Sequence, residues 1–182
     1  WFKSRNVVGN HGWMDTSRGK DGGTSFKTLF VTDAAERTSS SGYDLTSMNS
    51  DGFSYGRPNQ LDWAHDTPAN NVVWAWKCNG GTTSSFTESG NNPGGTIQTN
   101  TTAGFSIITT TGTGNTGTIA HGLGAVPEII ISKQRSNDEN WAIYHGSNTD
   151  APETEILTLN TNDATADNAN AYNDTAPTSS VF

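Results

Sequence analysis

The chain has 182 residues, a formal net charge of −8 and a sequence pI near 4.7. This acidic balance, with basic residues scattered along the chain, gives no electrostatic basis for binding nucleic acid or an anionic membrane surface. With 31% hydrophobic and 15% charged residues, long amphipathic helices are not expected, whereas six Trp and seven Phe favour a packed core over disorder. No apolar stretch approaches the ~20 residues that cross a bilayer, so membrane insertion is not expected.

The strands expected in the first part of the chain are short apolar or β-branched runs bounded by turn residues. They cover residues 1–6, 13–15, 26–32, 52–56 and 72–77. A hairpin turn at 9–12 joins the first two, and a polar segment follows the third. The run at 72–77 has the strongest strand pattern, and Asn79-Gly80-Gly81 ends it.

In the rest of the chain, residues 82–102 predict a long loop or a weak edge hairpin. Further strands are expected at 104–110, 118–121, 128–133, 141–144 and 156–159, with a turn at 112–117 and a sharp bend at 122–124. Helix is limited to a turn near 33–37 or 165–171. Short strands at intervals of about 10–20 residues are typical of an all-β protein, and we expect a jelly-roll-like β-sandwich.

An internal repeat relates the two ends of the chain at an offset of about 130 residues, longer than the repeat of a solenoid protein. The matched segments are 1–6 with 131–136, 12–15 with 140–145, 32–35 with 162–165, and 51–53 with 180–182. The repeat predicts a first β-sandwich module at 1–126, with its N-terminal strand cut, and a truncated second copy at 127–182. The chain would then be an excerpt of a longer modular protein, with exposed sheet edges around Trp1, Phe2, Val181 and Phe182.

Few residues form patterns that indicate catalysis or metal binding. The four His residues are far apart, and none has a Cys or carboxylate cluster at ligand spacing. His65, between Asp62 and Asp66, could be a base or a ligand, but a surface loop is the favoured explanation. Asx-turns explain the acidic segments 49–52 and 160–174 better than calcium does. We therefore predict no catalytic residue, no metal and no cofactor.

A glycine-rich stretch and the single cysteine both have structural explanations. The GxGxxG form at 112–117 is followed by a strand pattern rather than a helix, so it is a β-turn and not a nucleotide site. The single Cys78 is expected to be a small buried residue at the end of a strand.

The tryptophans are the remaining candidates for binding. Trp74 and Trp76 would share one strand face, where burial in the core is favoured over a platform for sugar rings. Trp63 is the least strand-like Trp, and we expect it to be partly exposed and able to stack on a sugar ring or an apolar patch. Trp63 and His65 are therefore the predicted binding residues.

The ordered motifs along the chain resemble a β-domain family common in bacteriophages, frequent in marine and cyanobacterial phages, in tail fibres and uncharacterised virion proteins. The residues that carry the resemblance are Trp1-Phe2-Lys3-Ser4-Arg5, Asp15-Thr16-Ser17-Arg18-Gly19, Ser50-Asp51-Gly52-Phe53, Val73-Trp74-Ala75-Trp76-Lys77, Ala103-Gly104-Phe105-Ser106-Ile107, Gly122-Leu123-Gly124-Ala125-Val126-Pro127 and Asn173-Asp174-Thr175-Ala176-Pro177-Thr178-Ser179-Ser180-Val181-Phe182. The resemblance covers the whole chain and implies a place on the virion surface, outside the cell.

We therefore expect a phage structural protein of the tail-fibre or appendage type, which mediates host-surface attachment or virion surface contacts. Its expected partners are other virion proteins, host envelope polysaccharide and further copies in a homo-oligomer. A capsid decoration or cement protein, and a bacterial extracellular filament subunit or lectin-like adhesin, remain alternatives. A capsule depolymerase would need a pair of carboxylates in a groove, and no such pair is evident in the sequence, so an enzyme is not expected.

Overall fold

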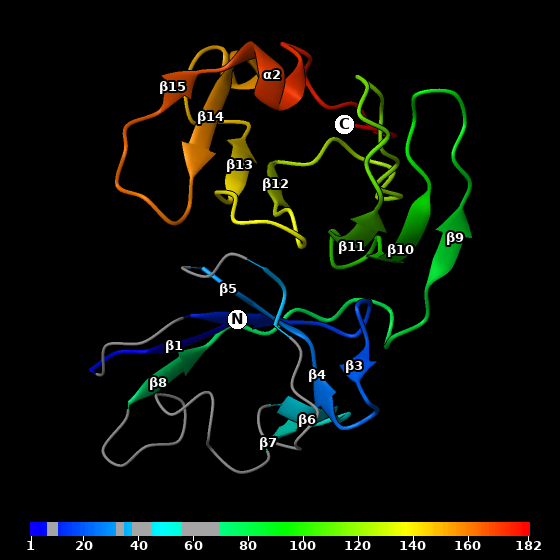
Figure 1. Ribbon diagram of the computed structural model, residues 1–182, viewed down its shortest axis with the longest axis vertical. Helices are drawn as coiled ribbons and strands as arrows, with labels where there is room; N and C mark the ends of the chain where they lie inside the picture. Colours follow the sequence, from blue (N-terminus) through cyan, green and yellow to red (C-terminus); the bar gives the residue numbers. More distant parts are fainter. Residues whose placement is uncertain (7–10, 32–34, 38–44, 56–69) are drawn as a thin grey trace. The chain divides into compact units, whose positions relative to one another are not determined.

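The computed structural model describes residues 1–6, 11–31, 35–37, 45–55 and 70–182 (Figure 1). Of these residues, 37% lie in strands and 5% in helix, and each strand pairing between them is antiparallel. The predicted all-β class is confirmed. No helix in these ranges has the length and apolar character needed to cross a membrane.

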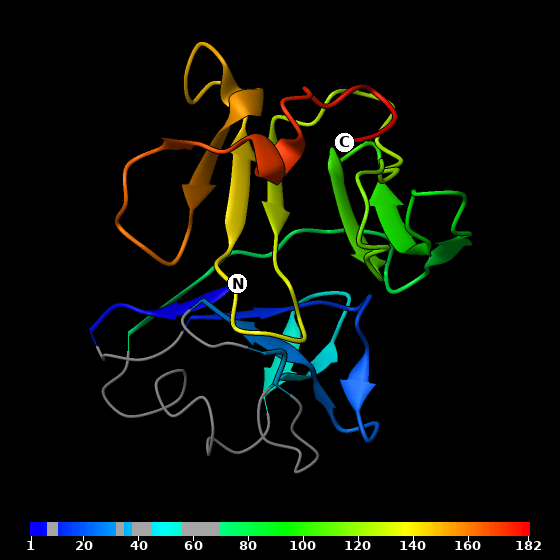
Figure 2. The ribbon, with the colours of Figure 1, turned by 45° about the horizontal axis from the view of Figure 1, so that its top comes forward.

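The chain folds into two compact units (Figures 1 and 2). Unit 1 holds residues 1–75 and 134–139, and unit 2 holds residues 76–133 and 140–182. These units reflect compactness, whereas the predicted modules at 1–126 and 127–182 reflect sequence similarity. The module boundary therefore stays a prediction.

Unit 1 contains a four-stranded sheet and two hairpins. The sheet has the order β5-β2-β1-β8, formed by β1 (Phe2–Ser4), β2 (Gly12–Met14), β5 (Thr28–Phe30) and β8 (Asn71–Val73). The hairpins are β3 (Lys20–Asp21) with β4 (Ser25–Phe26), and β6 (Leu45–Met48) with β7 (Phe53–Tyr55).

The core of unit 1 forms around Phe2 and Phe30, which are 6% and 1% exposed, with Met14 and Tyr55 packed against them. Strand β1 pairs with β2 on one side and with β8 on the other. The expectation of an exposed Phe2 at an open sheet edge is therefore wrong. The sequence could not show that Phe2 is covered, because β8, which pairs with β1, is some seventy residues away along the chain.

Unit 2 contains two sheets. The first has the order β11-β10-β9, from β9 (Ser84–Phe86), β10 (Gly95–Asn100) and β11 (Phe105–Thr110). The second has the order β12-β13-β14-β15, from β12 (Ile129–Ser132), β13 (Ala142–His145), β14 (Glu155–Thr158) and β15 (Ala166–Asp167). A 3-10 turn, η1 (Pro152–Thr154), precedes β14, and the short helix α2 (Ala169–Tyr172) follows β15.

Most strand predictions are confirmed, with two corrections. Of the two expectations for residues 82–102, a long loop or a weak edge hairpin, the structure shows the hairpin, formed by β9 and β10. The strand expected at 72–77 ends at Val73, and the one expected at 118–121 is reduced to a single bridge between Ala120 and Val181. Both runs are apolar enough for a strand, but no described neighbour pairs with their full length.

The segments related by the repeat share their strand order. Strands β1, β2 and β5 form an antiparallel meander, and so do β12, β13 and β14. The cross-strand pair Met14 with Thr28 matches the pair Ala142 with Thr158. The match does not reach the last segment, because Phe53 pairs with Met48 whereas the main chain of Phe182 bonds to Ile119.

Candidate functional site

The predicted binding residues Trp63 and His65, with the neighbouring Asp62 and Asp66, lie outside the described residues. The exposure of Trp63 therefore stays a prediction.

Trp74 and Trp76 contradict the expectation of a buried pair. They are 40% and 48% exposed, and they belong to different units, since the division falls after Ala75. Strand β8 ends at Val73, so the alternation that would turn both rings toward a core stops before it reaches them. Both tryptophans are thus candidates for contact with a ligand.

In unit 1, stacked aromatic rings fix the position of Trp74. The ring of Trp1 lies 4.7 Å from that of Trp74 and 5.1 Å from that of Trp13, with interplanar angles of 23° and 10°. Main-chain bonds place the stack, because the Trp74 amide donates to the Trp1 carbonyl. The ring of Trp74 is therefore held in place while much of its surface stays open to solvent.

In unit 2, Trp76 is held in a similar way. Its ring stacks on Phe105 at the start of β11, at 5.7 Å and an interplanar angle of 10°. The ring of Trp76 is thus supported by Phe105, and its exposed fraction is the largest among the described Trp residues.

The described histidines have structural partners at separate places. The Lys3 Nζ contacts Nε2 of His11, and burial together with the charge of Lys3 lowers the pKa of His11, so its neutral ring accepts this bond. The buried His121 bonds to the Thr178 carbonyl through Nε2 and accepts the Leu123 amide at Nδ1. Nδ1 of His145 accepts the Ser147 amide. These contacts fix loops rather than assemble a reaction centre.

Two carboxylates of unit 1 are also engaged in structural contacts. Asp15 and Glu36 both bind the buried guanidinium of Arg18, at 2.6 and 3.0 Å. In the described ranges, no group of three or more His, Cys, Asp or Glu side chains is placed to hold a metal ion. Cys78 is buried, as expected, with its thiol 3.0 Å from the Gln98 carbonyl.

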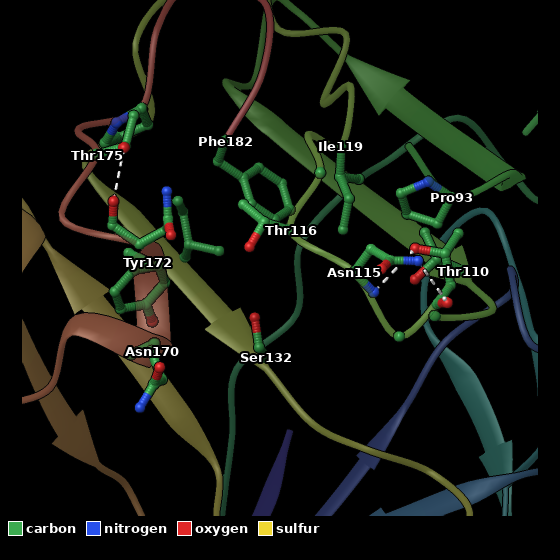
Figure 3. A pocket seen from close by; sticks show the side chains of 18 residues that line it. Pro93, Thr110, Asn115, Thr116, Ile119, Ser132, Asn170, Tyr172, Thr175 and Phe182 are labelled. Atoms are coloured by element: carbon green, nitrogen blue, oxygen red, sulfur yellow. Dashed lines mark hydrogen bonds between the residues drawn. The ribbon is translucent and has the colours of Figure 1, made fainter. Parts of the chain in front are cut away.

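A pocket of about 480 Å³ lies within unit 2 (Figure 3). In the close-up, Tyr172 and Asn170 from α2 lie on one side, and Thr116 and Asn115 lie on the other. None of the lining residues has a charged side chain, and the phenol of Tyr172 is the one titratable group among them. They are Pro93, Thr110, Gly112, Thr113, Gly114, Asn115, Thr116, Gly117, Ile119, Ile130, Ser132, Asn170, Ala171, Tyr172, Asn173, Thr175, Pro177 and Phe182.

Hydrogen bonds hold the two walls of this pocket. Thr113 donates to the Asn91 carbonyl at 2.9 Å, and the main chains of Ile119 and Phe182 bond to each other in both directions. Burial and the nearby Tyr144 raise the pKa of Tyr172, so its phenol stays neutral. The pocket therefore offers hydroxyl, amide and aromatic groups, which suit an uncharged polar ligand.

A family model matches the chain over residues 1–182, and its description is a domain of unknown function (DUF7483). The chain belongs to this family. No curated protein and no solved structure matches it.

The pocket of this DUF7483 chain was not predicted from the sequence. The GxGxxG stretch at 112–117 contains no helix and is followed by none, as expected, although the strand expected after it is only a single bridge. Nothing local in the sequence shows that residues 170–182 lie beside it. The bridge between Ala120 and Val181 brings these segments together. The one signal in the sequence is that both segments are rich in Thr and Asn and have few charged residues, which is also typical of an ordinary loop.

Proposed function

We propose that this chain is a module of a phage virion structural protein of the tail-fibre or appendage type. In this role it binds host envelope polysaccharide or other virion proteins at the virion surface and catalyses no reaction. The resemblance of its motifs and its all-β architecture support the setting. Its acidic, low-charge composition suits contact with neutral surfaces better than with nucleic acid.

One observation carries the binding role, which is that Trp74 and Trp76 are exposed and supported by other aromatic rings. A supported ring presents a flat apolar face without the entropic cost of fixing a mobile side chain. A single aromatic contact of this kind contributes about 1 kcal/mol. Useful affinity therefore requires several copies on one particle, which fits a homo-oligomeric appendage.

The pocket in unit 2 adds a second surface with the same chemistry. Its volume of about 480 Å³ is in the usual range for ligand sites, and its lining is uncharged. Sugars present hydroxyl groups and apolar ring faces, which match side-chain hydroxyls, amides and aromatic rings.

The test is a glycan array probed with multimerised chain. Trp74→Ala and Trp76→Ala should each lower binding about fivefold, the equivalent of ~1 kcal/mol per aromatic contact. Val126→Ala is the matched control, because Val126 is 55% exposed and apolar but not aromatic, and it should leave binding unchanged. Trp63→Ala, in a further arm, tests the prediction from the sequence.

Either of two results would contradict the proposal of glycan attachment. One is that no envelope polysaccharide binds the multimer, and the other is that the Trp variants bind as well as the Val126 control. Chain that still assembled on the virion would then have a purely structural role. Electron microscopy of labelled particles would separate a fibre from capsid decoration.

A further inference from the structure

The pocket of unit 2 is lined by polar uncharged and apolar side chains, and none of them supplies a positive charge. Unit 2 as a whole is acidic, with four Asp and four Glu against two lysines and no arginine. Neither lysine, Lys77 nor Lys133, lines the pocket. An anionic group that entered it would therefore lose water without gaining a counter-charge, whereas a neutral polar ligand meets no such cost.

The pocket also has hydroxyl groups that are free to bind a ligand. In the described part of the chain, the side chains of Thr116 and Ser132 form no hydrogen bond with another residue. In the close-up, both hydroxyl groups point toward the space below the ring of Phe182 (Figure 3). A ligand with several hydroxyl groups can therefore donate to and accept from them without breaking a bond inside the protein.

The wall that carries Phe182 is held in place by bonds of the protein itself. Asn173 ends α2 with a φ of 53°, in the left-handed region, and its carbonyl accepts a bond of 2.8 Å from the Thr175 hydroxyl. Nε2 of the buried His121 donates to the Thr178 carbonyl at 3.1 Å. Because this wall is preformed, little conformational entropy is lost there when a ligand binds.

We propose that this pocket binds one neutral sugar unit of a polysaccharide, a hexose or an N-acetylhexosamine, and excludes uronic acids. The inference rests on the proposed attachment function and names the class of sugar that this site selects. The neutral sugar places an apolar ring face against Phe182 and its hydroxyl groups against Thr116 and Ser132. A uronic acid has the same ring, but its carboxylate would enter an uncharged pocket of an acidic unit, where burial and repulsion both weaken binding.

The test measures sugar binding by the unaltered full chain in NMR titrations at neutral pH. The probes are glucose, galactose, mannose and N-acetylglucosamine, each paired with the uronic acid that has the same ring. At least one neutral sugar should cause saturable shifts in the signals of pocket residues. Its uronic acid should bind at least about tenfold more weakly, because the carboxylate has no counter-charge in the pocket.

An added positive charge on the pocket wall should change this preference. Thr116→Lys, and separately Asn115→Lys, should raise the ratio of uronic-acid affinity to neutral-sugar affinity at least about fivefold. Both positions are exposed, and thermal unfolding checks that the variants are folded. Thr83→Lys is the matched control, because it adds the same charge at an exposed threonine of unit 2 outside the pocket. It should change the ratio less than about twofold, since salt screens distant charges.

Any of three results overturns the inference: no sugar shifts the pocket signals, the uronic acids bind as tightly as the neutral sugars, or both Thr116→Lys and Asn115→Lys leave the ratio unchanged. Reduced array binding by the Trp74 and Trp76 variants, without any sugar shift at the pocket, would remove the pocket and leave the attachment function standing. Pocket shifts with no polysaccharide bound on the array would support neutral-sugar binding at this site and overturn attachment.

Discussion

The Arg18 guanidinium is the centre of a buried charge network in unit 1. Its side chain is 4% exposed and bonds to Asp15, to Glu36 and to the Trp13 carbonyl. Asp15 also accepts the amides of Ser17 and Arg18, which closes the turn after β2. Removing the arginine would leave the largely buried Asp15 without this counter-charge, and it would leave Glu36 with the partly exposed Arg135. We expect Arg18→Met to lower the free energy of unfolding by about 3–5 kcal/mol, measured by urea denaturation.

Arg135 provides the matched control, because it binds the same Glu36 at 3.5 Å with a side chain that is 40% exposed. An exposed ion pair contributes about 1 kcal/mol or less, so Arg135→Met should have a small effect. Equal losses in the two variants would show that burial of Arg18 does not determine its contribution.

At the scale of elements, the hairpin of β10 and β11 is the longest ladder described, with six residue pairs from Gly95 with Thr110 to Asn100 with Phe105. A Cβ atom on Gly95 would lie 1.9 Å from the Thr109 carbonyl oxygen, so the two strands require a glycine there. We expect Gly95→Ala to separate the strand ends and to lower the free energy of unfolding by about 1–3 kcal/mol.

Gly112 supplies the control for this prediction. A Cβ atom there meets nothing within 4 Å, and its φ lies outside the left-handed region. Gly112→Ala should therefore leave the free energy of unfolding unchanged or raise it by up to about 1 kcal/mol, because alanine lowers the conformational entropy of the unfolded chain. A loss as large as that of Gly95→Ala, in the same urea experiment, would mean that the close approach to Thr109 is not the cause.

At the scale of the whole molecule, the net charge of −8 opposes contact between copies of the chain. Protonation of carboxylates removes this repulsion as the pH approaches the pI near 4.7. We expect self-association, measured by light scattering, to increase from about pH 7 to about pH 5, and to increase with salt at about pH 7 because salt screens the charges. Association that is independent of both pH and salt would show that charge does not limit it.

The sequence by itself determined the class of fold and much of the strand pattern. The runs at 104–110, 128–133 and 141–144 became β11, β12 and β13, because alternation and β-branching act between near neighbours. The repeat, found from residue types alone, matched two meanders with the same strand order.

Tertiary structure decided which of these residues are exposed and which segments meet. Phe2 is buried because β8 pairs with β1, and Trp74 and Trp76 are exposed because β8 ends before them. The pocket exists because residues 178–182 return to residues 119–121. Local patterns carry no information about such contacts, since burial and pairing depend on strands that are distant along the chain.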